Sequence, residues 1–154
     1  MLVNLLRLPP ADAALEELRG LGLVVRRARP WELTAVREFV GEQFSRAWAD
    51  EISVGLVSRP ATVFVALRAG RLVGFAAYEC TRKNFFGPTG VVESERGRGL
   101  GRALLLAALH GLRELGYAYA IIGGVGPAEF YERAVGARLI PDSSPGVYAD
   151  PIKQ

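Results

Sequence analysis

A short run rich in glycine and arginine, residues 96–102, constrains the fold of this chain more than any other feature of its sequence. The run reads Arg-Gly-Arg-Gly-Leu-Gly-Arg and lies between a segment that predicts a strand and one that predicts an amphipathic helix. The first N–H groups of a helix have no internal acceptor, and the helix dipole favours negative charge there. Glycines let a ligand approach the backbone closely. The run therefore predicts a phosphate site at a strand-to-helix junction.

Two well-known phosphate-binding loops do not fit this run. The dinucleotide-binding fingerprint needs a third glycine three residues after its second. Counted from Gly97 that position is Arg102, and counted from Gly99 it is Leu104. The nucleoside-triphosphate loop needs Gly-Lys-Ser or Gly-Lys-Thr, a triplet that the sequence lacks. A glycine-rich helix start that binds no ligand is the alternative interpretation of the run.

The hydrophobic patterns around the run predict a mixed order of helices and strands. Helices are expected over residues 11–19, from Pro30 through Val40, and over 45–57, 99–115 and 127–135. Strands are expected over 21–28, 62–67, 72–78, 86–92 and 119–125, and the tail from 137 to 148 is expected to add one or two edge strands. Consecutive strands precede a strand-loop-helix-strand-helix order, which predicts an α+β (mixed α/β) fold rather than a doubly wound one.

Composition and charge narrow the class of protein. The 154 residues suffice for one domain, in which residues 1–20 form an N-terminal extension. The net charge of +3 favours an anionic ligand, but no dense basic run indicates nucleic acid. The single cysteine, Cys80, has no partner for an internal disulfide, and one histidine with one cysteine offers too few ligands for a metal centre. Without a long apolar segment, we expect a soluble cytoplasmic protein that does not bind membranes.

The stretch from Val91 to Leu105 resembles the acyl-CoA motif of the GNAT superfamily of N-acetyltransferases. That motif consists of Arg or Gln, two further residues, Gly, one residue, and then Gly or Ala; Arg96, Gly99 and Gly101 fill it. The resemblance follows the order of elements over residues 22–137 and is specific mainly over 88–137. It implies one GNAT-like domain with a central, mostly antiparallel mixed sheet of about six to seven strands, flanked by about four to five helices.

The resemblance also implies a donor substrate, acetyl-CoA, and a site that holds it without a metal. Backbone amides of the loop would bind the CoA pyrophosphate, and the backbone of a bulged strand would pair with the pantetheine arm. The residues implied are Val91 and Val92 on the strand, and Arg96, Gly97, Arg98, Gly99, Leu100, Gly101 and Arg102 in the loop. The acceptor would be a small-molecule or peptide amine that attacks the thioester directly, and a homodimer is common among similar proteins. A non-catalytic acyl-CoA sensor and a nucleic-acid-binding protein are the alternatives.

Tyr131 is the candidate acid, because Pro127 to Arg133 is similar to the last helix of the family, where a tyrosine often protonates the leaving thiolate. Packing in the core is the alternative role for this ring. Two positions depart from the family pattern: Val135 stands where a glycine is usual, and Gly124 stands where an asparagine is often found. For the base that deprotonates the amine, Glu79 at the end of a strand and a chain of waters are both candidates. Trp48 and Phe44 lie in a region that forms the acceptor pocket in similar proteins.

Overall fold

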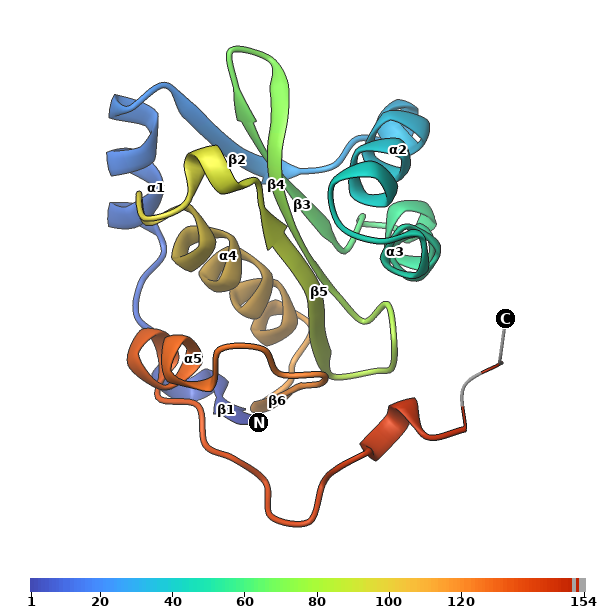
Figure 1. Cartoon of the computed structure of the whole chain (residues 1–154). Helices are drawn as coiled ribbons and strands as arrows, with labels where there is room; N and C mark the ends of the chain where they lie inside the picture. The colour runs from blue at the N-terminus through green and yellow to red at the C-terminus, as the bar shows by residue number, and fades with distance from the viewer. Residues whose placement is uncertain (151, 153–154) are drawn as a thin grey trace.

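The computed structural model describes residues 1–150 and 152 and shows a six-stranded open sheet in the order β1-β6-β5-β4-β3-β2 (Figure 1). Neighbouring strands are antiparallel except for β5 and β6, which are parallel. The strands are β1 (Leu2–Asn4), β2 (Leu23–Arg27), β3 (Val63–Arg68), β4 (Arg71–Tyr78), β5 (Phe85–Val91) and β6 (Tyr119–Ile122). A mixed, mostly antiparallel sheet of six strands confirms the predicted fold class.

Within the described residues, five α-helices cover the two faces of the sheet, which agrees with the expected number. In Figure 1 the helices α2 (Leu33–Gln43) and α3 (Arg46–Val57) lie on one side of the sheet. The helices α1 (Asp12–Gly20), α4 (Leu100–Glu114) and α5 (Ala128–Val135) lie on the other side. Each face has its own hydrophobic cluster, one around α4 and one around α2 and α3. The sheet therefore separates two groups of helices, each with its own hydrophobic core.

The long helix α4 is the centre of the larger core, because most of its residues between Leu100 and Leu112 are buried. Leucines and alanines fill this face, and both residue types have high helix propensity. At Gly111 the sheet comes so close that a Cβ would stand 2.7 Å from the Tyr78 hydroxyl oxygen. A residue with a side chain at this position would push α4 away from the sheet. The close contact fixes the helix whose first turn follows the glycine-rich loop.

The N-terminal extension forms one edge of the sheet. Leu2 lies opposite Ile121 in an antiparallel pair, and the N-terminal amine of Met1 donates to the Ile122 carbonyl at 2.7 Å. The expectation of edge strands over residues 137–148 is wrong: the tail makes one isolated bridge, Leu2 to Arg138, and a 3-10 turn over Gly146–Tyr148. Two physical reasons explain this. Strand β1 already occupies the edge beside β6, and prolines at 141 and 145 cannot donate to a ladder.

Strands β5 and β6 pair only where β5 starts and β6 ends. Phe85 lies opposite Ile121 and Phe86 opposite Ile122, after which β6 ends, three residues earlier than expected. A bulge lies farther along β5. Tyr78 of β4 pairs with Phe86 and Ala76 pairs with Thr89, so β5 has one more residue than β4 between the two pairs. The resemblance predicted a bulge beside Val91 and Val92; the observed one is at Gly87 and Pro88. Because β6 ends at Ile122, the rest of β5 has no strand neighbour on this side, which leaves a break in the sheet between β5 and β6.

None of the helices in the described part of the chain combines the length and the apolar character needed to cross a bilayer.

Candidate functional site

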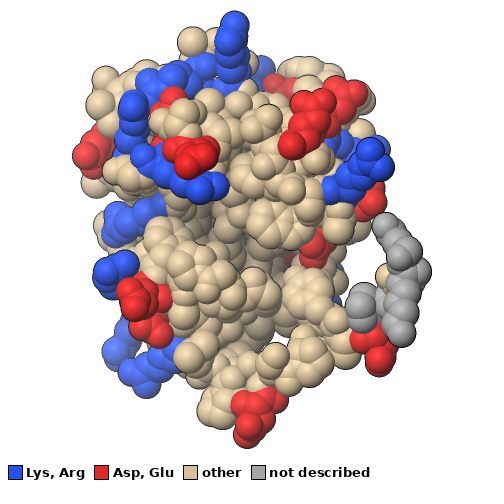
Figure 2. All heavy atoms as spheres, in the orientation of Figure 1, with Lys and Arg blue, Asp and Glu red and all other residues tan. Residues whose placement is uncertain are grey.

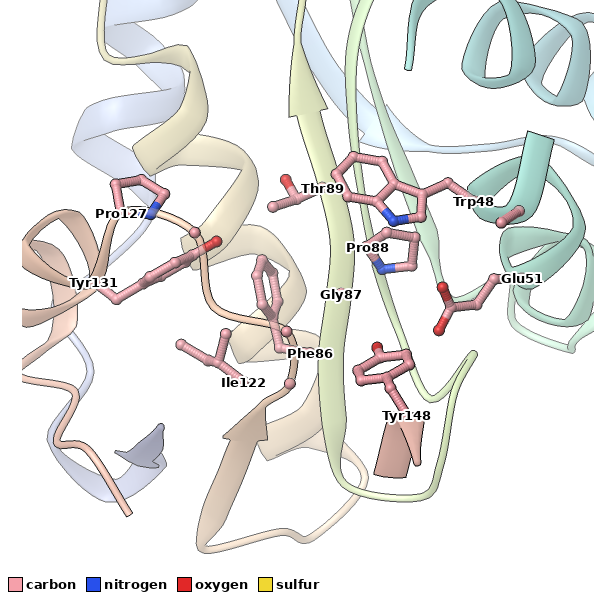
Figure 3. Close-up of a pocket in the computed structure, with 14 residues that line it drawn as sticks. Trp48, Glu51, Phe86, Gly87, Pro88, Thr89, Ile122, Pro127, Tyr131 and Tyr148 are labelled. Atoms are coloured by element: carbon pink, nitrogen blue, oxygen red, sulfur yellow. The ribbon is translucent and has the colours of Figure 1, made fainter. Parts of the chain in front are cut away.

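The break between β5 and β6 contains a cavity of about 470 Å³, which we call the central cavity (Figure 3). Helix α3 contributes Trp48 and Glu51 from one face of the sheet, and Tyr131 comes from α5 on the other face. The remaining wall is formed by β5, the end of β6 and the tail. The lining residues are Ala47, Trp48, Glu51, Phe86, Gly87, Pro88, Thr89, Ile122, Gly123, Gly124, Gly126, Pro127, Tyr131 and Tyr148. Helices from opposite faces of the sheet thus border the same space.

A second cavity of about 380 Å³, the loop cavity, lies at the start of α4. It is lined by Val91, Arg96, Gly97, Gly99, Gly101, Arg102 and Phe130. Six of the nine residues predicted to hold the cofactor are in this set; Val92, Arg98 and Leu100 are not. Phe130 of the loop cavity and Tyr131 of the central cavity are neighbours on α5, and both cavities border β5. An elongated ligand held at the loop would have its far end near Tyr131.

The backbone of the loop presents amide groups to the loop cavity. Gly97 and Gly99 have left-handed φ angles of 76° and 79°, a conformation that disfavours a Cβ. The Ala103 amide donates to the Gly99 carbonyl at 3.0 Å, so the three preceding amides, at residues 100–102, come before the first helical hydrogen bond. These groups carry the positive end of the helix dipole. The geometry suits an anion.

The three arginines of the loop are not equivalent. Arg96 and Arg102 line the loop cavity, whereas Arg98 lies with Nη1 3.8 Å from Oε2 of Glu95. Hydrogen bonds from Arg68 hold the pKa of Glu95 below its ordinary value, so this carboxylate partly neutralises the charge of Arg98. In Figure 2 basic side chains crowd the side of the molecule that carries the loop, and the surface between α3 and α5 is mostly uncharged.

Val91 and Val92 differ in what their backbone groups bind. The Val92 amide donates to the Val73 carbonyl at 3.0 Å, and the Val92 carbonyl accepts from the Glu95 amide at 3.0 Å. Because successive peptide groups of a strand point in opposite directions, the backbone groups of Val91 face away from β4 and toward the break in the sheet. The Val91 carbonyl also accepts from Nε of Arg96 at 3.1 Å. Of the two valines, Val91 is the one that lines the loop cavity.

Tyr131 is mostly buried at the central cavity, with 7% of its surface exposed. Its ring packs edge-on against Phe130 and Phe86, with centroids 5.0 and 6.2 Å away. Figure 3 shows its hydroxyl directed into the cavity, between α5 and β5. Burial raises the pKa of the Tyr131 phenol, so it keeps its proton at neutral pH. The residue packs in the core, and its protonated hydroxyl faces the cavity.

Glu79 lies away from this group of residues and lines neither cavity. Its carboxylate accepts from the Tyr117 hydroxyl at 2.7 Å and from Nζ of Lys83 at 2.9 Å. Burial raises the pKa of Glu79, but these hydrogen bonds outweigh it and leave the pKa below its ordinary value. A left-handed φ of 56° at Glu79 ends the alternation of β4 and turns the side chain toward Lys83. The carboxylate is bonded to a separate surface turn.

Two residues of the central cavity, Glu51 and Tyr148, were not among the predicted site residues. Glu51 follows Trp48 by three positions, and residues at this spacing share one face of a helix. That spacing was the signal that could have identified it. Tyr148 reaches the cavity from the tail, at the end of the 3-10 turn over Gly146–Tyr148, which follows residues 141–145 without a regular element. Its sequence neighbourhood holds no comparable signal.

Comparison with protein families identifies the fold. A family model described as an acetyltransferase (GNAT) domain matches residues 59–134, about half of the chain. The chain belongs to the GNAT superfamily. The match extends over β3 to β6, the loop, α4 and most of α5, so it includes the break in the sheet. No curated protein is similar enough in sequence to match the chain.

Solved GNAT structures share this fold at low sequence identity. A GCN5-related glucosamine N-acetyltransferase region of a fungal multi-domain GH3 β-N-acetylglucosaminidase has a TM-score of 0.70 and 18% identity over 87% of this chain. A GCN5-related N-acetyltransferase from Sphaerobacter thermophilus has a TM-score of 0.64 and 24% identity over 86% of this chain. A GNAT acetyltransferase from Brucella melitensis, in complex with acetyl-CoA, has a TM-score of 0.55 and 23% identity over 72% of this chain and 80% of its own. The chain spans only 19% and 45% of the first two chains.

Within residues 1–150 and 152, no three His, Cys, Asp or Glu side chains lie close enough together to hold a metal ion.

Proposed function

We propose that this GNAT domain transfers an acetyl group from acetyl-CoA to a primary amine. One observation carries the proposal: a loop with unbonded helix-start amides lies next to a break in the sheet that is open to both groups of helices. The loop suits a pyrophosphate, and the break suits a thin arm that must reach an acceptor on the other side. The Brucella melitensis neighbour was solved with acetyl-CoA, which supports the same donor here.

In this proposal the CoA pyrophosphate binds the amides of residues 97–102, with Arg96 and Arg102 as counter-charges. The pantetheine arm lies along the backbone edge of Val91, and the thioester reaches the central cavity near Tyr131. Val92 is left out of the donor contacts, because both of its backbone groups are already bonded within the protein. The assignment therefore keeps most of the predicted loop and uses one valine in place of two.

The chemistry follows from the groups that face the thioester. The lone pair of a neutral amine attacks the carbonyl carbon, the nitrogen gives up a proton to water, and the C–S bond breaks. The leaving thiolate takes the proton of the Tyr131 phenol, which is then restored from solvent. The products are an N-acetyl amine and CoA. Glu79 has no part in this scheme, because its carboxylate is bonded to Lys83 and Tyr117.

Calorimetric titration with acetyl-CoA and with CoA, followed by detection of CoA thiol release with a panel of amines, tests the proposal. Gly101→Val is the informative variant: a Cβ there meets only Phe130 and Val91, at 3.8 and 3.9 Å, so the fold accepts it. The branched side chain would project into the loop cavity, and we expect acetyl-CoA affinity to fall by more than about tenfold. Gly20→Val, at the end of α1, is the control.

The outcomes separate the candidates. Acetyl-CoA binding that Gly101→Val removes and Gly20→Val retains, together with amine turnover, establishes the transferase. Binding without turnover of any amine would indicate the acyl-CoA sensor instead. Equal affinity of the wild type and a folded Gly101→Val variant would show that the pyrophosphate lies elsewhere.

A further inference from the structure

In the part of the chain that the structure describes, the central cavity is lined by one acidic side chain and by no basic one. Of the fourteen described residues that line it, Glu51 is the one acidic residue, and the set contains no lysine, arginine or histidine. A carboxylate in a mostly apolar wall binds a cation and repels an anion. A ligand that carried its own carboxylate would have to lose water from it with no basic side chain in the lining to replace that water.

The Glu51 carboxylate is held in place rather than free to swing away. The Thr81 hydroxyl donates a hydrogen bond to its Oε1. Burial raises the pKa of the nearby Tyr148 phenol, a hydrogen bond with Thr81 lowers it, and the negative charge of Glu51 raises it. In Figure 3 the Tyr148 hydroxyl and the Glu51 carboxylate point toward each other beside Pro88. The contacts fix the Glu51 carboxylate on the α3 side of the cavity.

Flat apolar surfaces stand on both sides of this carboxylate. The Trp48 indole is stacked on Phe44, with centroids 6.0 Å apart, and meets Phe75 edge-on at 6.2 Å. These contacts fix the indole, while 36% of Trp48 remains exposed. The ring of Tyr148 and the ring of Pro88 add two more flat faces. Such walls suit an aromatic or short aliphatic body, and aromatic faces also attract an ammonium.

The two ends of the cavity come from different helices. Tyr131 on α5 stands on the side of the loop cavity, and Trp48 and Glu51 on α3 stand on the opposite side (Figure 3). A donor that enters along the loop leaves the α3 side for the acceptor. About 470 Å³ must hold the acetyl end of the donor as well, which limits the acceptor to a small molecule.

We propose that the acceptor is a small primary amine with an apolar, preferably aromatic, body and no carboxylate, and that Glu51 receives its ammonium group. The inference rests on the proposed acetyl transfer and specifies its acceptor. Amines of this kind are protonated at neutral pH, as a lysine side chain is. Glu51 therefore collects the charged form, which loses its proton to solvent before the nitrogen attacks the thioester.

A matched pair of substrates tests the inference, because 2-phenylethylamine and phenylalanine differ only in the carboxylate. With saturating acetyl-CoA, we expect kcat/KM measured by CoA release to be at least about tenfold higher for 2-phenylethylamine. Glu51→Gln should lower that value by roughly 10- to 100-fold, the effect of losing a hydrogen bond to a charged group. Asp50→Asn is the control: its side chain lies on the same helix but is 75% exposed.

Binding of the amine alone gives a readout that does not need turnover. In a Trp31→Phe background the single indole N–H signal in a ¹⁵N–¹H spectrum belongs to Trp48, since the chain has two tryptophans. We expect 2-phenylethylamine to shift this signal, with or without CoA present, and phenylalanine to leave it in place. Glu51→Gln should weaken the shift and Asp50→Asn should not.

Failure of the inference and failure of the proposed function are distinguishable. Equal turnover and binding of the two amines, or an unchanged response in Glu51→Gln, would overturn the acceptor assignment and leave acetyl transfer standing. Turnover of peptides or amino acids alone would overturn it as well. If acetyl-CoA does not bind, the proposed function fails, and selective shifts of the Trp48 signal would still support the cavity as an amine site.

Discussion

Arg68 and Glu95 form a two-pronged salt bridge directly before the glycine-rich loop. Nε of Arg68 donates to Oε1 of Glu95 at 2.6 Å, and Nη2 donates to Oε2 at 2.9 Å. The third nitrogen, Nη1, donates to the Leu21 carbonyl at 2.8 Å. One guanidinium thus links the end of β3, the turn after α1 and the 3-10 turn over Glu93–Glu95. Side chains far apart in the sequence thus anchor the turn that precedes the loop of the proposed pyrophosphate site.

Replacing Arg68 with methionine should weaken acetyl-CoA binding although Arg68 does not line the loop cavity. The variant leaves the mostly buried Glu95 carboxylate without its main partner, and the turn before the loop loses its anchor. We expect the Kd for acetyl-CoA to rise roughly tenfold, since removing one member of such a pair reorganises its surroundings. Calorimetry measures the change. Arg71→Met, at the exposed start of β4, is the control; equal affinities in both variants would contradict the linkage.

Tyr131→Phe should separate catalysis from binding. The phenylalanine ring keeps the packing against Phe86 and Phe130 but cannot donate a proton to the thiolate. We expect kcat to fall by about 100-fold, within the usual range for a general acid, and the acetyl-CoA Kd to stay within about twofold. Steady-state kinetics and calorimetry give the two numbers. An unchanged kcat would assign protonation of the thiolate to solvent.

The pH dependence of turnover gives a second test of Tyr131. Because burial raises the pKa of its phenol, the group remains a proton donor up to and beyond the ordinary tyrosine range near 10. We therefore expect no loss of kcat due to Tyr131 below pH 10 in the wild type. A fall in kcat between pH 8 and 9 that Tyr131→Phe abolishes would be inconsistent with the burial seen here.

The sequence predicts the fold well where local pattern and tertiary contact agree. Helix α4 was expected within one residue at each end, because its leucine stripe needs a buried face and Gly116 can adopt the left-handed conformation that ends it. Strand β1 was not expected. Its three residues become a strand only by pairing with β6, and the bond from Met1 to Ile122 spans 121 positions. A three-residue segment is too short to show the alternation of apolar and polar residues that predicts a strand.

In the candidate site, too, local features could be predicted from the sequence and features that depend on tertiary contacts could not. The conformation of the loop from Arg96 to Arg102 could be predicted from its glycines, because a left-handed φ angle is a local requirement that glycine meets. Glu79 was proposed as a base from the alternation of a strand, yet its left-handed φ breaks that alternation. Glu51 meets the tail residue Tyr148 only through the turn that brings residues 146–148 back to α3. The spacing of residues in the sequence cannot predict this contact between the tail and α3.

Glu79→Gln tests whether this carboxylate is structural. Because the pKa of folded Glu79 lies below its ordinary value of 4.5, the unfolded chain binds the proton more readily. The ionised side chain thus contributes stability above about pH 4.5, and this contribution is lost as the pH falls through the folded pKa. We expect it to be less than about 1 kcal/mol, because Lys83 is largely exposed. Denaturant unfolding from pH 3 to 7 measures it.

The kinetic half of the same experiment bears on the proposed chemistry. With its carboxylate bonded to Lys83 and Tyr117, Glu79 should not influence transfer, so Glu79→Gln should retain kcat within about twofold. A drop of 100-fold with an intact fold would restore Glu79 as the base and would require the turn at Lys83 to open.

Cys80 should make the fold sensitive to alkali. Its side chain is 8% exposed, and burial raises the pKa of the thiol from its ordinary 9.0 to about 11. Between these values an unfolded chain loses the proton and the folded chain keeps it, so the stabilising contribution is present below pH 9 and is lost as the pH rises through 11. Each pKa unit corresponds to about 1.4 kcal/mol, so the full loss is roughly 2 to 3 kcal/mol.

Comparison with Cys80→Ala isolates this effect, because the tyrosines and lysines titrate alike in both proteins. We expect the wild-type free energy of unfolding to fall relative to that of Cys80→Ala between pH 9 and 10.5, with parallel curves below pH 8.5. Iodoacetamide should react with the native thiol at pH 8 far more slowly than with the thiol in denaturant, since the thiolate is the nucleophile. Fast labelling of the native protein would show that the region around Gly55 and Thr62, which the structure packs against Cys80, opens readily.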